Sequence, residues 1–328
     1  MGCPTYRILA IQMYCPMIVI YMIVYTELKS IEKDLGIPLK TLFSVSNNLS
    51  SHYKKVKIAK KNGGTRELRV PDYILKKIQR AICDTFLVYE PISKYAQAYR
   101  FGSSVQKNAS YHINKKKILK LDIKHFFDSI LYTTVKDKCF PSDRFSEPIR
   151  ILLSVLCYYG DALPQGAPSS PVITNIIMKD FDIEVGSFCE KRNISYTRYC
   201  DDMTFSGDFD EKEIISFVKE KLFSCGYLIN NKKTTVVKEG KCQLVTGIVV
   251  NKRLSTPSEY KAKIRQEIYF GTKYGFENHL NHTGNQTELK SYIESLLGRV
   301  SFALQTEPDN NEFKKYKAQL IKYKKSIS

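Results

Sequence analysis

ISYTRYCDDMTFSG, residues 194–207, places two adjacent aspartates between stretches rich in aromatic and β-branched residues. Such stretches favour β-strands, so the segment predicts a strand, a tight turn and a second strand, with Asp201 and Asp202 at the turn. Neighbouring carboxylates repel each other, and apolar surroundings increase that cost unless a cation offsets it. The pair therefore indicates a metal site, although a lone Asp-Asp pair is also common in exposed turns.

A third carboxylate ends a separate apolar run. Asp122 lies in ILKLDIKHFFDSI, residues 118–130, where the spacing of apolar residues resembles a buried strand. If this strand lies beside the strands predicted over residues 194–207 in one sheet, the three acids come together. Carboxylate oxygens suit Mg²⁺, which can bridge a triphosphate and hold an attacking hydroxyl in line. The three acids together favour phosphoryl-transfer chemistry.

The flanking sequence predicts a mixture of hairpins and helices. Residues 52–72, HYKKVKIAKKNGGTRELRVPD, contain Asn62-Gly63-Gly64 between two basic runs and predict a hairpin. LPQGAPSSP, residues 163–171, interrupts the regular secondary structure and ends at a helix start. Further expected elements are helices over 73–89, 172–190 and 211–223, a strand over 245–250, and a helical, lysine-rich tail from Pro257.

Composition points to a polyanionic partner. The 328-residue chain has a formal net charge of +18 and 12% aromatic residues. This charge would be costly self-repulsion without nucleic acid or an anionic membrane surface to offset it, and aromatic rings can stack on bases. Nine cysteines, an odd number without any C-x-x-C pair, argue against a disulfide framework and favour a reducing, cytoplasmic setting.

The N-terminal run from Ile8 to Tyr25 is almost wholly apolar and of borderline transmembrane length. It fits poorly with a secretory signal, because Pro16 lies inside it and Arg7 is the single basic residue before it. Three interpretations follow: a membrane or partner-binding segment, a packed hydrophobic arm, or an extension from an upstream start codon. We favour the last two, and a membrane partner is not expected.

Four segments resemble the reverse transcriptase family, and they follow one another along the chain in the family's order. Residues 199–202, Tyr-Cys-Asp-Asp, match its Tyr-x-Asp-Asp signature, and LKLDIKHFFDSI matches its first-aspartate motif. LPQGAPSSP also matches, and GYLINNKKT, residues 226–234, resembles the lysine-bearing motif that follows the catalytic turn. The resemblance extends from about Lys54 to about Val250.

This resemblance implies roles for particular residues. Asp122 and Asp201 correspond to the principal ligands of two Mg²⁺ ions, with Asp202 in support and the Ile123 carbonyl as a backbone ligand. The implied mechanism is two-metal phosphoryl transfer.

The resemblance also implies a nucleotide site. Phe127 falls where a bulky ring would exclude a ribose 2′-hydroxyl, although a core position is the ordinary explanation for a phenylalanine. Gln165 and Gly166 correspond to residues that contact the incoming nucleotide and template. Arg66 corresponds to a fingers arginine that grips the triphosphate, and Lys60, Lys61 and Arg69 could assist or could be solvated charges.

Two shorter strings resemble bacterial retron enzymes. Residues 108–112 match an Asn-Ala-x-x-His element and residues 245–247 match a Val-Thr-Gly element. These strings imply candidates for RNA recognition, namely Asn108, His112, Val245, Thr246 and Gly247. Alternatively, Asn108 caps a local turn and His112 packs in the fingers. Retron resemblance further implies dNTP substrates, a structured noncoding RNA as template and primer, a start at the 2′-hydroxyl of an internal guanosine, a branched RNA–DNA product, and an effector protein in antiphage defence.

The fold implied by the resemblance is an α+β right-hand polymerase, with fingers, a palm built on an antiparallel sheet plus helices, and a helical thumb. We expect an apolar extension of uncertain role over 1–26, N-terminal helices and fingers over 27–117, a palm with interleaved fingers elements over 118–253, and a thumb over 254–328. Alternatives are a group II intron-type reverse transcriptase, which should carry a longer C-terminal segment, a non-catalytic RNA-binding scaffold, and a membrane-anchored basic protein.

Overall fold

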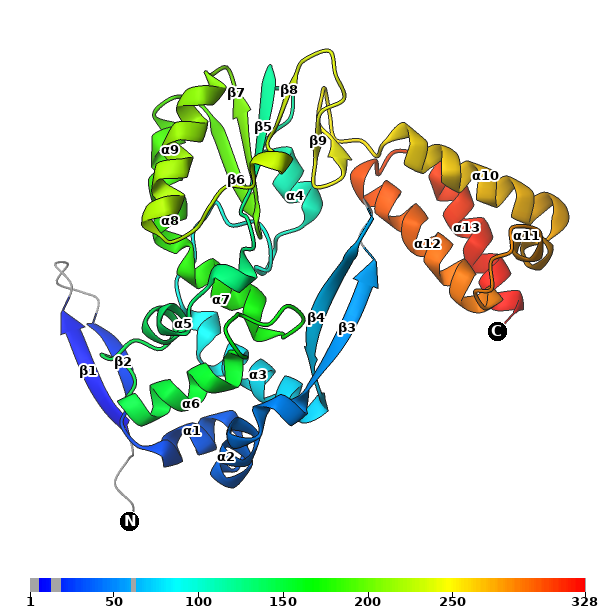
Figure 1. Cartoon of the computed structure of the whole chain (residues 1–328). Coiled ribbons are helices and arrows are strands. Elements are labelled where there is room, and N and C mark those ends of the chain that lie inside the picture. Colours follow the sequence, from blue (N-terminus) through cyan, green and yellow to red (C-terminus); the bar gives the residue numbers. More distant parts are fainter. Residues whose placement is uncertain (1–5, 13–18, 60–62, 328) are drawn as a thin grey trace.

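The segment around the paired aspartates forms two strands of an antiparallel sheet. The computed structural model describes residues 6–12, 19–59 and 63–327. Four strands lie in the order β6-β7-β5-β8 (Figure 1). Their bounds are β5 Lys117–Asp122, β6 Ser195–Tyr199, β7 Asp202–Gly207 and β8 Thr235–Lys238. The central strands β5 and β7 are almost entirely buried, as their apolar residues predict.

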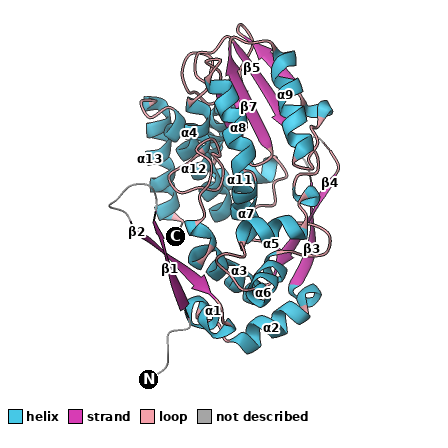
Figure 2. Ribbon diagram, turned by 90° about the vertical axis from the view of Figure 1, so that its left-hand side faces the viewer, coloured by secondary structure: helices cyan, strands magenta, loops and turns pink. Residues whose placement is uncertain are grey.

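Helices pack along this sheet and below it. α8 (Lys179–Glu190) and α9 (Glu211–Ser224) flank the strands (Figure 1 and Figure 2). One continuous hydrophobic core joins the sheet to a group of helices from both sides of β5 in the sequence. These helices are α1 Leu28–Leu35, α2 Leu39–Asn47, α3 Tyr73–Thr85, α5 Tyr132–Cys139, α6 Glu147–Cys157 and α7 Ser169–Ile177.

Two expected elements are subdivided. The single helix expected over 172–190 is interrupted at Met178, whose ψ of 3° lies outside the helical range and separates α7 from α8. The single strand expected over 245–250 is a short hairpin, β9 (Leu244–Val245) with β10 (Ile248–Val249). Its two loop residues, Thr246 and Gly247, have φ of 47° and 82°, which is the geometry of a tight hairpin turn rather than of a strand.

The basic hairpin is confirmed. β3 (Tyr53–Ala59) pairs with β4 (Thr65–Pro71) in antiparallel register, from Tyr53 opposite Pro71 to Ala59 opposite Thr65. Most of its side chains are exposed, and the ribbon projects from the helical group toward the C-terminal helices (Figure 1).

The C-terminal region is a helical unit with its own core. Ile264, Leu296 and Phe313 are among its buried residues. The unit follows β10 and lies apart from the sheet (Figure 1). Its helices are α10 Ser258–Tyr274, α11 Phe276–His282, α12 Leu289–Thr306 and α13 Asn311–Ser326.

The two described parts of the N-terminal apolar run pair as antiparallel strands. β1 (Tyr6–Gln12) pairs with β2 (Val19–Tyr25), and Tyr25 enters the main core, where its ring stacks on Phe145 at 5.3 Å and meets Phe86 edge-on at 5.1 Å. Within the described part of the chain, no helix has both the length and the apolar character needed to cross a membrane.

Candidate active site

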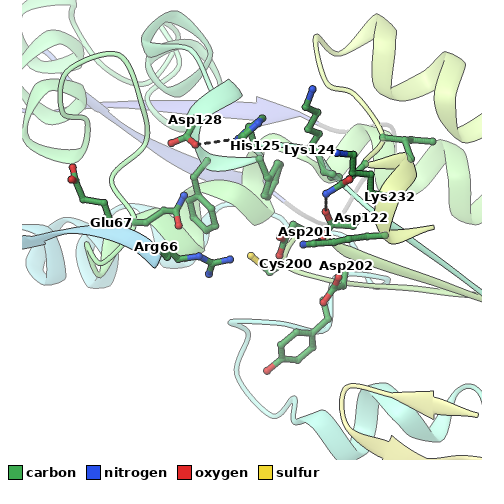
Figure 3. A pocket seen from close by; sticks show the side chains of 18 of the residues that line it. Arg66, Glu67, Asp122, Lys124, His125, Asp128, Cys200, Asp201, Asp202 and Lys232 are labelled. Atoms are coloured by element: carbon green, nitrogen blue, oxygen red, sulfur yellow. Dashed lines mark hydrogen bonds and ion pairs between the residues drawn. The ribbon is translucent and has the colours of Figure 1, made fainter. Parts of the chain in front are cut away.

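The three acids lie at one end of the sheet, as expected if the strands that carry them pair side by side. Asp122 is the last residue of β5 and stands directly opposite Asp202, the first residue of β7. Asp201 precedes Asp202 in the β6–β7 turn, and its carbonyl oxygen accepts a hydrogen bond from the Ile123 N–H at 3.1 Å. Backbone pairing therefore brings together residues about 80 positions apart in the chain. Figure 3 shows the three carboxylates on one wall of a cavity.

The turn that carries Asp201 is tight. Tyr199 pairs with Asp202, which leaves Cys200 and Asp201 as a two-residue hairpin loop. Cys200 has a φ of 62°, a conformation that a non-glycine residue adopts only at a cost. Surrounding contacts must therefore hold this turn, and they fix where Asp201 lies.

Two contacts to Asp122 were not foreseen from the sequence. Asn230 Nδ2 donates to Asp122 Oδ1 at 3.0 Å, and Lys233 Nζ donates to Asp122 Oδ2 at 2.6 Å. Both residues belong to GYLINNKKT, the segment matched to a lysine-bearing motif, so the motif was recognised but its contact partner was not. In the ion pair, the Asp122 carboxylate is almost fully buried and Lys233 is about half exposed.

The charge of Asp202 is poorly compensated. Loss of solvation, followed by repulsion from Asp201 and Asp122, raises the pKa of Asp202 to about 6, although Lys233 and Lys120 oppose the shift. The side chain still reaches the cavity, so the walls around it, rather than complete burial, account for the lost solvation. An added cation would relieve this repulsion.

The donor set fits a hard divalent cation that is completed by substrate. Among the described residues, no three His, Cys, Asp or Glu side chains form a ready-made metal cage. Mg²⁺ is commonly held by one or two carboxylates together with substrate phosphates, rather than by a protein cage. Three carboxylates at one sheet edge, one of them with a raised pKa, match that mode of binding.

The acids line a cavity of about 940 Å³, which also contains most of the predicted nucleotide-site residues. Arg66 reaches toward the acids from β4 (Figure 3) and makes no ion pair within the described residues. Phe127 and Gln165 also line the cavity, as do Tyr99 and Lys124. Tyr99 carries no motif in the sequence, and its φ of 55° is unusual for an aromatic residue.

The loop containing Gln165 and Gly166 is built onto β4. The Arg69 N–H donates to the Gln165 carbonyl at 2.9 Å, and a Cβ on Gly166 would lie 3.1 Å from the Arg69 carbonyl oxygen. Gly166 has a φ of 119°, so both its conformation and this close approach favour glycine.

The Arg69 side chain has a structural partner. Its Nη1 donates to the Tyr159 carbonyl at 3.0 Å, and the guanidinium lies over the Tyr159 ring. These contacts account for Arg69 without a phosphate, although it also lines the cavity. Lys60 and Lys61 lie outside the described residues.

The two retron-like strings meet each other in the interior. Asn108 in α4 (Val105–Ser110) donates from Nδ2 to Thr246 Oγ1 at 3.4 Å, and Thr246 Oγ1 donates to the Val105 carbonyl at 3.1 Å. Val245 packs in a small apolar cluster together with Ala109. The strings thus join α4 to the β9–β10 turn.

His112 lies deeper than recognition of RNA would require. Its ring nitrogens lie 2.7 Å from Ser206 Oγ and 2.8 Å from Thr197 Oγ1, and burial lowers the pKa of His112 to about 3, which leaves the ring neutral. Asn108, His112 and Val245 are fully buried. A role of these three residues in RNA recognition stays a prediction, and their burial favours support of the surface over direct contact. Of the five candidates, Thr246 is partly exposed and Gly247 is exposed.

Comparisons with known proteins agree with this site. Residues 58–263 match the family model described as reverse transcriptase (RNA-dependent DNA polymerase). The chain is 32% identical over 299 residues to the retron Ec83 reverse transcriptase of Escherichia coli, covering 85% of this chain and 91% of that one. The chain belongs to the reverse transcriptase family.

Within that family, the chain's relatives include a second retron enzyme. The retron Mx65 reverse transcriptase of Myxococcus xanthus is 28% identical over 242 residues, covering 66% of this chain and 56% of that one. Among solved structures, a foamy viral protease-reverse transcriptase in complex with double-stranded DNA is similar at 17% identity and a TM-score of 0.43, covering 85% of this chain and 41% of that one.

Family membership confirms the expected fold and activity. This retron-type reverse transcriptase is an α+β right-hand polymerase and an RNA-directed DNA polymerase that acts on nucleic acid. Enzymes of this family use divalent metal ions, which agrees with the acid cluster. Within this fold we expect the four-stranded sheet to form the palm, the β3–β4 ribbon to belong to the fingers and α10–α13 to form the thumb.

Proposed function

We propose that this reverse transcriptase copies part of a cognate structured noncoding RNA, starting from the 2′-hydroxyl of an internal guanosine. The product is a branched RNA–DNA molecule, and the system serves in cytoplasmic antiphage defence with an effector protein. Identity to the Ec83 retron enzyme over most of both chains supports this proposal. The net charge of +18 supports an extended nucleic-acid partner.

The observation that carries the catalytic part is the register of Asp122 opposite Asp202, with Asp201 held beside Ile123. We assign Asp122 and Asp201 as the principal Mg²⁺ ligands, with Asp202 in support and the Ile123 carbonyl as a further oxygen. Bound Mg²⁺ would lower the pKa of the attacking hydroxyl and neutralise the pyrophosphate leaving group.

Other cavity residues bind and orient the nucleotide in this proposal. Arg66 provides a guanidinium without a competing acid, which suits a triphosphate. Phe127 occupies the space beneath the sugar and excludes a 2′-hydroxyl by its bulk. Gln165 and Gly166 present a loop fixed on β4 against the nucleotide and template.

RNA recognition is shared between a surface turn and its support. Thr246 and Gly247 are the accessible candidates for RNA contact, and we assign Asn108 and His112 the task of holding the turn and the strands behind it. Hydrogen-bonding groups of such a turn suit RNA, whose 2′-hydroxyls offer partners beyond phosphate.

Co-expression with RNA transcribed from the DNA flanking the gene tests this function. The expected product is DNA covalently attached to RNA. Ribonuclease should shorten the RNA to a branched stub, and a 2′,5′-debranching enzyme should release the DNA from that stub. Its formation in vitro should require Mg²⁺ and stop with EDTA. DNA that is only linear and primed at a 3′-hydroxyl would contradict the branched product while leaving polymerase activity intact.

A further inference from the structure

Arg198 lies immediately before the catalytic turn and is fully buried. It lies on β6, three residues before Asp201. Nothing in the residue pattern of this strand marks Arg198 as special. A buried guanidinium is expensive unless a charge and several acceptors satisfy it. The structure supplies both.

Asp182 on α8 provides the charge. Arg198 Nε donates to Asp182 Oδ1 at 2.8 Å and Nη2 donates to Asp182 Oδ2 at 2.7 Å, so the pair is bidentate. Both side chains have no exposed surface. Tyr196 adds a hydrogen bond from its hydroxyl to Asp182 Oδ1 at 2.9 Å. This geometry fixes the guanidinium plane relative to α8.

The remaining guanidinium nitrogen of Arg198 bonds to the β6–β7 turn. Arg198 Nη1 donates to the carbonyl oxygen of Cys200 at 3.0 Å. This carbonyl belongs to the peptide group that precedes Asp201, and the peptide group that follows Asp201 is held by the Ile123 N–H. Both peptide planes around Asp201 are therefore fixed from outside the turn.

The same residue ties the turn to a segment that lines the cavity. The Arg198 N–H donates to the Tyr95 carbonyl at 2.9 Å, and the Gln97 N–H donates to the Arg198 carbonyl at 2.8 Å. Asn175 on α7 donates to the Ala98 carbonyl at 2.8 Å and accepts a longer hydrogen bond from Arg198 Nη2. The residue after Ala98 is Tyr99, which lines the cavity.

We propose that Arg198, locked by Asp182, is a positioning residue that sets the backbone orientation of Asp201 through the Cys200 carbonyl. It touches neither substrate nor metal. Because catalysis depends on placing ligands within a fraction of an ångström, loss of this bond should slow the chemical step while leaving nucleic-acid binding intact. The inference rests on the proposed role of Asp201 as a metal ligand.

The test uses a neutral double variant, Arg198→Met with Asp182→Asn. Removing one partner alone would leave the other as an unpaired buried charge. The double change leaves no buried charge at this position and keeps an acceptor for the Tyr196 hydroxyl. A matched control is Arg144→Met with Glu90→Gln, which neutralises a mostly buried ion pair away from the cavity. Arg198→Lys is a second variant, which keeps the charge but lacks the fork that serves Asp182 and Cys200 together.

Three measurements are made on full-length protein with a primed RNA template. We expect the rate of single-nucleotide addition at saturating dNTP and Mg²⁺ to fall at least tenfold in the double variant. Primer–template Kd should stay within twofold and the control rate within twofold of wild type. Without Mg²⁺, hydrogen exchange should become faster at the Ile123 amide, because its acceptor on Asp201 is less firmly held. Arg198→Lys should lose at least threefold in rate.

A double variant with wild-type rate and unchanged Ile123 exchange would overturn the inference. A control that loses as much rate as the double variant would also overturn it, because general destabilisation would then suffice. If the double variant does not fold, Arg198→Lys decides, and a wild-type rate in that variant would overturn the inference. Retained synthesis after Asp201→Asn would instead refute the proposed function, so the two failures can be distinguished.

Discussion

At the scale of single residues, Phe127 offers a direct test of substrate choice. Its half-buried ring lines the cavity and packs edge-on against Phe126, with centroids 5.7 Å apart. We expect Phe127→Val to weaken discrimination against ribonucleotides about tenfold, because the smaller side chain leaves room for a 2′-hydroxyl. Relative kcat/KM for dNTP and rNTP measures this. Phe223→Val, an exposed position outside the cavity lining, is the control, and unchanged discrimination in Phe127→Val would make the ring purely structural.

Asp202 predicts a pH-dependent stability difference. Its pKa in the folded protein, about 6, lies above the ordinary value of 3.8, so the folded state binds more protons between these values and ionised Asp202 opposes folding above pH 6. In EDTA at pH 8, Asp202→Asn should raise the free energy of unfolding by about 1 kcal/mol, allowing for the exposure of the side chain. The gain should shrink as the pH falls toward 4. Thermal melts at pH 5 and pH 8 decide, and a variant less stable than wild type at pH 8 would contradict the assignment.

The three acids could be identified from the sequence because their signals are local: Asp122 ends an apolar strand, and Asp201 and Asp202 lie at the turn between two further strands. The contacts of Asn230 and Lys233 with Asp122 could not be found in this way, because they join residues more than 100 positions apart across the site. The Asp182–Arg198 pair was missed for a related reason. Neither residue is unusual in its own element, and only the packing of α8 against β6 brings them together.

At the scale of elements, the N-terminal hairpin predicts a sharp boundary for truncation. Tyr25 is buried, and its backbone pairs with the chain on both sides of Phe145, through Arg144 and Ser146. Translation from Met22 should therefore preserve polymerase activity and thermal stability. A chain that starts with a methionine placed directly before Glu27 lacks Tyr25. Its free energy of unfolding should be lower by about 3 kcal/mol, because this core aromatic residue is lost. Thermal melts and primer extension measure both, and equal behaviour of the two truncations would show that Tyr25 does not anchor the core.

The α4 segment predicts a stability effect in place of a recognition effect. His112→Ala removes the partner of two buried hydroxyls and should lower the free energy of unfolding by about 2 kcal/mol. Synthesis should fall equally on the cognate RNA and on an artificial primed template. The control is Tyr111→Ala, an exposed neighbour. A selective loss on the cognate RNA with unchanged melting temperature would restore a recognition role.

Element types were more predictable than their interruptions. Apolar periodicity indicated the helical residues of α7 and α8 but not the break at Met178, which carries no proline or glycine signal. Thr246-Gly247 contains a turn signal in its glycine, yet the positive φ of Thr246 is unusual for a β-branched residue and depends on its contacts with α4. Tertiary packing therefore decided both departures.

At the scale of the whole molecule, the acid cluster lies at the end of β5 and the start of β7, and residues of the β3–β4 ribbon line the same cavity. Charge and composition favoured a nucleic-acid partner, and the strand patterns around the acids suggested a sheet that brings them together. The position of helices α10–α13 could not be derived from composition, because it depends on how their core joins the rest of the chain through the β9–β10 region.

Extension of a primed RNA template by Asp201→Asn/Asp202→Asn, beside wild-type protein, tests the central claim most directly. The substitutions are isosteric and remove two negative charges without touching the basic surface. The account predicts loss of DNA synthesis by at least a thousandfold in Mg²⁺, with RNA affinity within about threefold of wild type. Substantial synthesis by the double variant, at unchanged RNA affinity, would contradict the assignment of these carboxylates as the catalytic centre.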